Sequence, residues 1–327
     1  MNLRQGDKAL AKILVVGSLN MDLVAIAPRI PVVGETIIGD TYFTEPGGKG
    51  ANQAYAAGLL GGSVAMLGRI GKDEFGQEMR NNLLKVGCDV EGIRVEEGVS
   101  GVALIFVSAT GQNSIIVVPG ANTKFAPEHI RADSKYLVGS KVVLLQLENP
   151  TPTVLEAARE SRKAGAKVIL DPAPAPESPL PDELFRCVDV LTPNETEGAI
   201  LAGFPPGRLE PQQAARLGRQ LQSKGVATVV MKLGDQGCVI VDKGDPLWLS
   251  APKVDAKDTT AAGDVFNAAL SVGLSEGLDM QAACRFANYA ASLSVTRLGA
   301  QVAVPTRKEV DEFASSAAVK PPQTVSA

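Results

Sequence analysis

The sequence of 327 residues has one histidine and four cysteines, and aromatic residues make up only 4% of it. A single histidine excludes a histidine-rich metal site and makes any Ser-His-Asp or Cys-His catalysis depend wholly on His129. His129 lies in an amphipathic helical segment, where a solvated side chain is the simpler interpretation. The cysteines form no Cys-x-x-Cys pair, which indicates buried free thiols in a reducing cytoplasm. They are Cys88, Cys187, Cys238 and Cys284.

Long apolar runs and clusters of positive charge are also missing. No stretch is long enough to span a bilayer, and the first residues lack the hydrophobic core of a signal peptide. The net charge is −4 and lysine and arginine are scattered, so neither nucleic acid nor a membrane is indicated as a partner. Hydrophobic residues at 45% and charged residues at 21% predict a soluble, cytoplasmic globular protein.

Short apolar strands alternate with amphipathic helices from residue 141 onward. This pattern predicts a three-layer α/β/α core in which a mostly parallel sheet has helices on both faces. Segments 32–45 and 101–119 instead show the loose alternation and turn residues of antiparallel strands. We expect these two insertions to form a small antiparallel β lid over an active site. One domain at 12–316 and a flexible tail at 317–327 complete the prediction.

The segment 258–264, Asp-Thr-Thr-Ala-Ala-Gly-Asp, leads directly into an apolar helical pattern. Small residues leave backbone N–H groups uncovered at a helix start, where the helix dipole also favours an anion. An acid is poorly suited to a pocket that only holds phosphate. An acid at this position is explained if Asp264 takes a proton from a hydroxyl that attacks the phosphate. The alternative is that Asp264 is simply an acid in the first turn of a helix.

A second glycine-rich turn, Gly-Gly-Lys-Gly at 47–50, gives way to an alanine-rich helix. Lys49 and Asn52 are three residues apart and therefore share a face of its first turn. The turn is not a P-loop, because Gly50 follows the lysine, and not a Rossmann fingerprint, because Gln53 replaces the third glycine. A flexible turn without a ligand remains the alternative.

Acidic and amide residues recur just after the predicted strands. The carboxyl ends of parallel strands meet at one edge of a sheet, so these residues are expected to lie in one crevice. Local turn chemistry is the alternative for each, such as an Asx turn at Asn20 and Asp22. The residues are Asn20, Asp22, Glu148, Asp171, Asn194 and Glu197.

These motifs resemble those of the ribokinase-like (PfkB) carbohydrate kinases, over nearly the whole chain from residue 12 to residue 313. The most specific matches are Gly-Gly-Lys-Gly-Ala-Asn-Gln-Ala at 47–54 and Asp-Thr-Thr-Ala-Ala-Gly-Asp-Val-Phe at 258–266. Supporting matches lie at 17–22, 194–197 and 295–301. The resemblance implies the fold described above and ATP-dependent phosphorylation of D-ribose at its 5-hydroxyl, giving D-ribose 5-phosphate and ADP.

The resemblance also implies roles for individual residues. Asp264 would be the base, and the N–H groups of Ala261, Ala262 and Gly263 would form the anion hole. The residues implied for the sugar hydroxyls are Asn20, Asp22, Gly48, Lys49, Asn52, Glu148 and Asp264. Those implied for ATP are Asn194, Lys232, Gly234, Gly237 and Asn288. Glu197 would support Mg²⁺ through water.

Kinases of this family are commonly activated by a monovalent cation, usually K⁺. The implied ligands are Asp258 and the carbonyls of Thr260, Val295, Arg297 and Gly299. Ala303 stands where related kinases often carry a serine, so one hydroxyl ligand is absent. The lid of the family usually pairs two subunits, which predicts a homodimer.

Two alternatives remain open. The same chemistry on 2-deoxyribose, fructose or a nucleoside is the nearest, although the low aromatic content leans mildly against a nucleoside stacked between rings. A non-catalytic sugar- or nucleotide-binding regulator on a kinase scaffold is the other, since a fold alone does not carry a function. A regulator is expected to have lost its base or anion hole, whereas Asp264, Gly263, Asn194 and Glu197 are all present.

Overall fold

A computed structural model describes residues 12–317 and 321–326. Its main sheet contains β1 (Ile13–Val16), β4 (Val64–Gly71), β5 (Ile93–Glu96), β8 (Val142–Leu145), β9 (Lys167–Leu170), β10 (Val190–Leu191), β11 (Thr228–Lys232), β12 (Cys238–Val241), β13 (Leu247–Leu249) and β14 (Gln323–Thr324). The strand order is β14-β13-β12-β11-β10-β9-β8-β1-β4-β5. Pairing is parallel from β5 across to β11 and antiparallel between β11, β12, β13 and β14. The expectation of a mostly parallel sheet is therefore confirmed.

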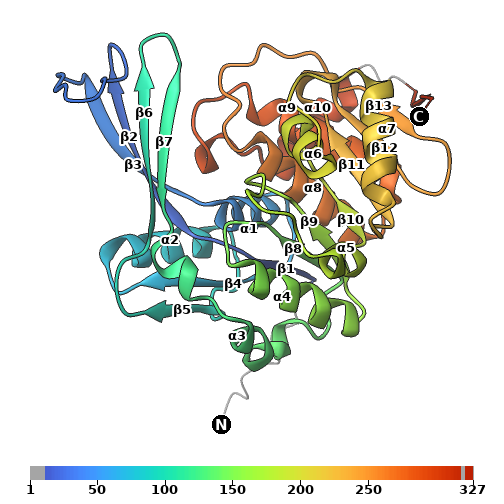
Figure 1. The fold of residues 1–327 in the computed structure, drawn as a ribbon, viewed down its shortest axis with the longest axis horizontal. Coiled ribbons are helices and arrows are strands. Elements are labelled where there is room, and N and C mark those ends of the chain that lie inside the picture. Colours follow the sequence, from blue (N-terminus) through green and yellow to red (C-terminus); the bar gives the residue numbers. More distant parts are fainter. Residues whose placement is uncertain (1–11, 318–320, 327) are drawn as a thin grey trace.

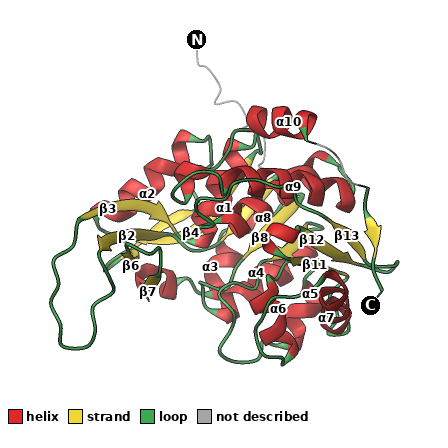
Figure 2. Ribbon diagram, turned by 90° about the horizontal axis from the view of Figure 1, so that it is seen from above, coloured by secondary structure: helices red, strands yellow, loops and turns green. Residues whose placement is uncertain are grey.

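Helices cover both faces of this sheet (Figure 2). One layer holds α1 (Lys49–Leu59), α2 (Glu74–Lys85), α8 (Ala262–Glu276), α9 (Met280–Ser294) and α10 (Arg307–Ser316). The other holds α3 (Pro127–Ala132), α4 (Thr151–Lys163), α5 (Asp182–Cys187), α6 (Glu195–Ala202) and α7 (Pro211–Gln222). Short 3₁₀ turns are η1 (Gly120–Lys124), η2 (Ser134–Tyr136), η3 (Gly234–Gln236) and η4 (Gln301–Ala303). Both faces of the central strands are buried, because Ile13 and Val15 pack in one apolar cluster and Leu14 and Val16 in the other.

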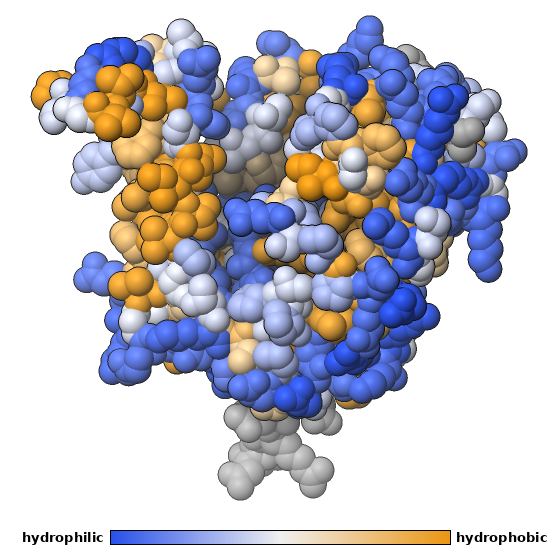
Figure 3. All heavy atoms as spheres, viewed as in Figure 1, coloured by the Kyte–Doolittle hydropathy of each residue, from blue (hydrophilic) through white to orange (hydrophobic). Residues whose placement is uncertain are grey.

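The lid is a second sheet of four strands that stands away from the main body (Figure 1). It contains β2 (Asn20–Ala27), β3 (Thr41–Gly47), β6 (Gly101–Ser108) and β7 (Asn113–Val118), in the order β3-β2-β6-β7. The pair β2–β6 is parallel and the two outer pairs are antiparallel. Apolar side chains are exposed along its strands (Figure 3).

The expected bounds of the first lid insertion, 32–45, were wrong. The chain enters the lid at Asn20 and leaves it at Gly47, and residues 28–40 form a connection with no regular strand. Pairing of β2 with β3 runs from Asn20 opposite Gly47 to Ile26 opposite Thr41, so the chain must turn between them. The alternating pattern at 32–40 marked this turn and not a strand.

The expected flexible tail also needs a correction within its described part. Gln323 and Thr324 pair with β13, and the N–H of Val325 donates to the carbonyl of Pro246 at 2.9 Å. Val325 is buried in the apolar cluster that includes Trp248. These contacts cover β13, which would otherwise be the edge of the sheet, and so give the end of the chain a structural role.

The cysteines and the histidine have structural positions within the described residues. All four cysteines are free thiols; Cys88, Cys238 and Cys284 are buried and Cys187 is half-buried. His129 accepts a hydrogen bond at Nδ1 from the N–H of Ala126, at the start of α3, which is a local capping role. Within the same residues, no helix is both long and apolar enough to cross a membrane.

Candidate active site

The start of α8 has an unusual backbone. Ala261 has φ 56°, the one positive φ of a non-glycine residue in the described chain. This conformation costs roughly 1–2 kcal/mol for a residue with a side chain. It completes a tight turn in which the N–H of Ala262 donates to the carbonyl of Thr259 at 3.2 Å. Strain held at a helix start is typical of a functional position.

This turn changes the expected anion hole. The N–H of Ala262, which we expected to face an anion, is already engaged by Thr259. The N–H groups of Ala261, Gly263 and Asp264 have no hydrogen-bond partner among residues 12–317 and 321–326. Three donors therefore remain at the positive end of the α8 dipole, but they belong to a slightly different set of residues.

Asp264 lies in the first turn of α8 and is only 5% exposed. Its carboxylate accepts hydrogen bonds from Asn52 Nδ2 at 3.1 Å and from Gln53 Nε2 at 3.0 Å. Burial raises the pKa of Asp264 to about 6, although Lys49 and these two hydrogen bonds oppose the increase. The carboxylate is thus ionised at neutral pH, with a pKa close enough to 7 to accept a proton effectively.

Asn52 is placed differently from its expected role. Its amide donates to Asp264, and its carbonyl accepts a hydrogen bond from Gln301 Nε2 at 3.0 Å. Gln301 in turn accepts from Asn82 Nδ2 at 2.6 Å. Asn52 therefore connects the carboxylate to η4 and α2, which leaves it less free to bind a sugar hydroxyl than we expected.

The residues expected to hold the sugar do converge. Strand β2 carries Asn20 and Asp22 two residues apart on one face, and Glu148 follows β8 across the crevice. Glu148 Oε2 accepts from Ser18 Oγ at 2.5 Å, from the N–H of Lys49 at 3.0 Å and from Asn20 Nδ2 at 3.4 Å. Burial, together with the charges of Glu148, Glu45 and Asp264, raises the pKa of Asp22 to about 7. The result is a crevice rich in hydrogen-bond acceptors, as a polyol requires.

Two glycines bring α1 against this crevice. Gly48 has φ 88°, and a Cβ on it would lie 2.6 Å from the backbone nitrogen of Asn20. A Cβ on Gly50 would lie 2.5 Å from the nitrogen of Ser18. Any side chain at either position would push α1 and Lys49 away. Burial alone would lower the pKa of Lys49, but the neighbouring carboxylates raise it, so the amine stays charged.

Asn194 and Glu197 bond to each other at the start of α6. Glu197 accepts from the N–H of Asn194 at 2.8 Å and from its Nδ2 at 2.9 Å, while Asn194 Oδ1 accepts from the N–H of Glu197 at 2.8 Å. This reciprocal pair is a capping box. Within the described residues no group of three or more His, Cys, Asp or Glu side chains is arranged to hold a metal ion.

Two adjoining cavities meet at the start of α8. The α6–α8 cavity, of about 410 Å³, is lined by Lys49, Asp171, Asn194, Glu197, Lys232, Ala261, Gly263 and Asp264 among others. The α8–α9 cavity, of about 420 Å³, is lined by Lys232, Gly234, Gly237, Ala251, Gly263, Phe266 and Asn288 among others. Asn194, which we expected to lie beside ATP, therefore lines the α6–α8 cavity together with Lys49 and Asp264.

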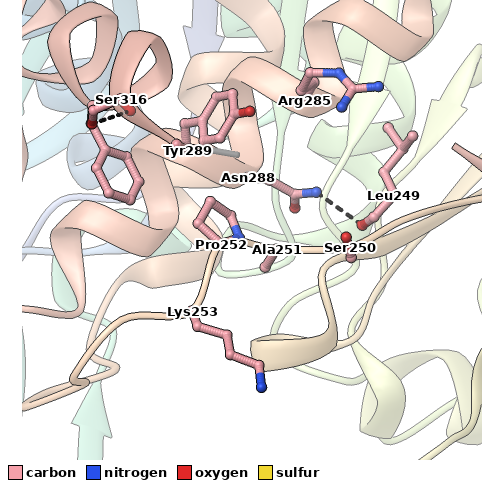
Figure 4. Close-up of a pocket in the computed structure, with 11 residues that line it drawn as sticks. Leu249, Ser250, Ala251, Pro252, Lys253, Arg285, Asn288, Tyr289 and Ser316 are labelled. Atoms are coloured by element: carbon pink, nitrogen blue, oxygen red, sulfur yellow. Dashed lines mark hydrogen bonds between the residues drawn. The ribbon is translucent and has the colours of Figure 1, made fainter. Parts of the chain in front are cut away.

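The wall of the α8–α9 cavity depends on two residues that the sequence singled out. Asn288 Nδ2 donates to the carbonyl of Leu249 at 3.1 Å, as Figure 4 shows. Asn288 also borders a further cavity of about 310 Å³ together with Arg285 and Tyr289. Gly237 has φ 92°, and a Cβ on it would lie 2.1 Å from the carbonyl oxygen of Leu249. Asn288 therefore bonds to the strand end at Leu249, and the missing side chain of Gly237 allows that strand end to lie close to the turn.

The two loops expected to bind a monovalent cation, 258–260 and 295–299, lie next to each other. Several of their polar atoms form hydrogen bonds within and between these loops. Asp258 accepts from the N–H and hydroxyl of Thr260 and from the N–H of Gly299 at 2.9 Å. The carbonyl of Val295 accepts from the N–H groups of Lys257 and Asp258 at 2.7 and 3.2 Å, so both of its lone pairs are in use. The carbonyls of Thr260, Arg297 and Gly299 accept no hydrogen bond from the described residues. Val295 is therefore not available as a ligand here, and buried Ala303 supplies no hydroxyl.

Several residues of the site were missed in the sequence. Gln53 Nε2 donates to both Asp264 and Asp171, and its carbonyl accepts from Gln146 Nε2 at 2.6 Å. Asn122 Nδ2 donates to Asn20 Oδ1 at 2.9 Å and so holds that side chain. Two features of the sequence could have indicated these residues. Gln53 lies inside the 47–54 motif, and Gln146 directly follows β8. Gln301 is the last residue of the 295–301 match, whereas Asn122 lies in a turn with no comparable pattern.

A buried carboxylate beside free helix N–H groups, with an acceptor-rich crevice on one side, defines a site for phosphoryl transfer to a hydroxyl. The chain belongs to the pfkB family of carbohydrate kinases: the model of the "pfkB family carbohydrate kinase" matches residues 10–307. It is 40% identical over 300 residues to a ribokinase of Haemophilus influenzae, covering 91% of this chain and 97% of the relative.

Two further relatives bear on the substrate. The structure of Arabidopsis thaliana ribokinase complexed with ribose and ATP matches with a TM-score of 0.86 and 36% identity, over 93% of this chain and 98% of that one. A deoxyribokinase of Salmonella typhi is 34% identical over 304 residues, covering 93% of this chain and 98% of the relative. Relatives of similar overall likeness thus carry the names of two different pentose kinases.

Proposed function

We propose that this chain transfers the γ-phosphoryl group of ATP to the 5-hydroxyl of D-ribose, giving D-ribose 5-phosphate and ADP. The observation that carries the proposal is the position of Asp264. Its buried carboxylate lies between the acceptor-rich crevice of Asn20, Asp22 and Glu148 and the free N–H groups at the start of α8. A hydroxyl bound in the crevice would face both a base and an anion hole. The ribokinase relatives support ribose as the sugar.

The proposed mechanism needs no covalent intermediate. The ribose 5-oxygen attacks the γ-phosphorus as its proton passes to Asp264, and the bond from phosphorus to the bridging oxygen of ADP breaks with its electron pair left on ADP. The N–H groups of Ala261, Gly263 and Asp264 stabilise the charge of the transferring group. Mg²⁺, when bound with the nucleotide, neutralises phosphate charge, and Glu197 with Asn194 would hold its water ligands.

We also propose that the loop at 258–260 and 295–299 takes a monovalent cation, K⁺. Asp258 and the carbonyls of Thr260, Arg297 and Gly299 would be its ligands, while Val295 and Ala303 do not fit. Phosphorylation measured in K⁺ and in a large organic cation tests it. A rate that does not depend on K⁺ would show that the hydrogen bonds of Asp258 hold the loop by themselves.

The acceptor is the part of the proposal that most needs a direct test. We expect a coupled ADP-release assay over ribose, 2-deoxyribose, fructose and nucleosides to give the highest kcat/KM for ribose. A higher kcat/KM for 2-deoxyribose would assign the chain to the activity named for the Salmonella typhi relative. Binding of ATP and ribose without ADP formation on any acceptor would instead indicate a regulator.

We propose that two copies of the chain pair through their lids. Strand β7 is an edge of the lid sheet, and its residues are exposed although they include Ile115, Ile116, Val117 and Val118. An exposed apolar edge strand favours pairing with another chain (Figure 3). We further propose that the protein works in the cytoplasm, where its free thiols would stay reduced.

A further inference from the structure

Lys232 is a buried cation at the point where the two cavities meet. It is the last residue of β11 and 9% exposed. The α6–α8 and α8–α9 cavities share Lys232, Gly234, Thr259, Ala262 and Gly263 as lining residues. These shared residues lie where the cavity that contains Asp264 adjoins the α8–α9 cavity, so a phosphoryl group that passes between the two cavities passes them. Lys232 is the one among them with a charged side chain.

The ammonium group of Lys232 lies directly beside the anion hole. A Cβ placed on Gly263 would be 3.4 Å from Lys232 Nζ, an ordinary van der Waals contact. The ammonium group therefore lies close to the backbone of Gly263, whose N–H has no partner among the described residues, and both residues line the two cavities. An anionic oxygen in the cavity beside them could accept hydrogen bonds from both groups.

Asp171 holds the lysine in this position. Lys232 Nζ lies 2.8 Å from Asp171 Oδ1, and Asp171 Oδ2 accepts from Gln53 Nε2 at 3.0 Å. Asp171 takes one of the three donors of the ammonium group, and the other two have no hydrogen-bond partner among the described residues. A buried ammonium with unused donors that line a cavity is suited to bind an anion.

We propose that Lys232 is a catalytic residue that contacts the transferring phosphoryl group, and that Asp171 is the positioning residue that aims it. The proposal rests on the kinase function proposed above. Lys232 donates hydrogen bonds to the equatorial oxygens as the bond to ADP breaks and the bond to the acceptor oxygen forms. It keeps its own proton, since the proton of the hydroxyl goes to Asp264 and the electron pair stays on ADP. The gain comes from charge stabilisation alone.

The test compares Lys232→Met with the double variant Lys232→Met/Asp171→Asn. The single variant leaves Asp171 buried without its partner and is expected to unfold more easily. The double variant removes both charges and keeps the acceptor for Gln53, so it is expected to fold. We expect kcat of the double variant to fall by about 10²–10³-fold, the usual cost of losing one group that stabilises the transition state. The KM for the acceptor and the affinity for ADP are expected to change by less than about threefold.

A second measurement separates catalysis from structure. The complex with ADP, aluminium fluoride and the acceptor mimics the transferring group, and the double variant is expected to bind it more weakly by the same factor as kcat. Arg208→Met is the matched control, because it removes the cation of an exposed ion pair with Asp235 beside the same cavity and leaves kcat unchanged. A double variant that keeps more than a tenth of kcat would overturn the proposal, as would equal losses in ADP affinity and kcat. Each assay uses the best acceptor of the panel, so failure on ribose alone does not affect the result.

Discussion

Gln53 Nε2 lies 3.0 Å from a carboxylate oxygen of Asp264, although 211 residues separate the two along the chain. The same amide reaches Asp171, and its carbonyl accepts a hydrogen bond from Gln146. Gln53 thus joins α1, α8 and the carboxyl ends of β8 and β9 around the base. Its hydrogen bond lowers the pKa of Asp264 against the larger effect of burial.

Replacing Gln53 by leucine should raise the pKa of Asp264. A hydrogen bond to a charged group is worth about 1.5–3 kcal/mol, so we expect the acidic limb of kcat/KM to move up by about one to two pH units. The groups that still act on the carboxylate are Lys49, Lys232, Asp171, Asp22 and Asn52. Gln77→Leu, which removes an exposed glutamine on α2, is the control and should leave the profile unchanged. An unshifted limb in Gln53→Leu would contradict this role.

The unmodified protein should lose activity as the pH falls through about 6. A base accepts a proton only when it is ionised, and the pKa of Asp264 is about 6. Asp22, with a pKa of about 7, should gain its proton first. We therefore expect the KM for the sugar to rise below pH 7 and kcat to fall below pH 6, measured between pH 5 and 9. Constant kcat down to pH 5 would be incompatible with Asp264 as the base.

Asp264→Asn should remove the base and keep the shape of the site. General base catalysis contributes about 10²–10⁴-fold, and we expect kcat to fall by that factor. Calorimetry should find the affinities for sugar and nucleotide within about threefold of the original values, because the asparagine still accepts a hydrogen bond. If the variant retained more than a tenth of kcat, Asp264 would be only a helix acid.

Gly48→Ala should destabilise the protein because of crowding and not only because of its backbone conformation. Gly48 and Gly61 both have φ 88°, but a Cβ meets the backbone of Asn20 at Gly48 and nothing within 4 Å at Gly61. Overpacking costs about 1–3 kcal/mol, so Gly48→Ala should lower the free energy of unfolding by that much more than Gly61→Ala. Urea denaturation of the two variants measures the difference, and equal losses would mean that the contact with Asn20 can relax.

Ile116→Lys should separate a dimer that forms through the lid. Ile116 on β7 is 57% exposed, and a lysine there would place a charge in the proposed interface. Light scattering after size-exclusion chromatography should report a monomer for Ile116→Lys and a dimer for the unmodified chain. Val138→Lys adds the same charge at an equally exposed valine outside the lid and should remain a dimer. Identical masses for all three proteins would exclude a lid interface.

Local patterns were sufficient for the architecture and for part of the site. Alternating strands and helices predicted the mostly parallel sheet, because each pattern depends on residues that are close in sequence. The glycines at 47–50 and the small residues before Asp264 marked two helix starts, since a missing side chain is visible in the sequence itself. The convergence of Asn20, Asp22 and Glu148 followed from the rule that the ends of parallel strands share one edge.

Tertiary structure alone decided which polar groups are free and which are occupied. The turn at Ala261 engages the N–H of Ala262, Gln301 engages Asn52, and Val295 is taken by Lys257 and Asp258. The tertiary structure also placed β14 beside β13 and the ammonium group of Lys232 beside Gly263. Each of these contacts joins groups whose distance depends on how the chain turns between elements, and a hydrogen bond is lost within a fraction of an ångström. The sequence by itself therefore determined the type of site and its main residues, and the packed fold determined the geometry in which they meet.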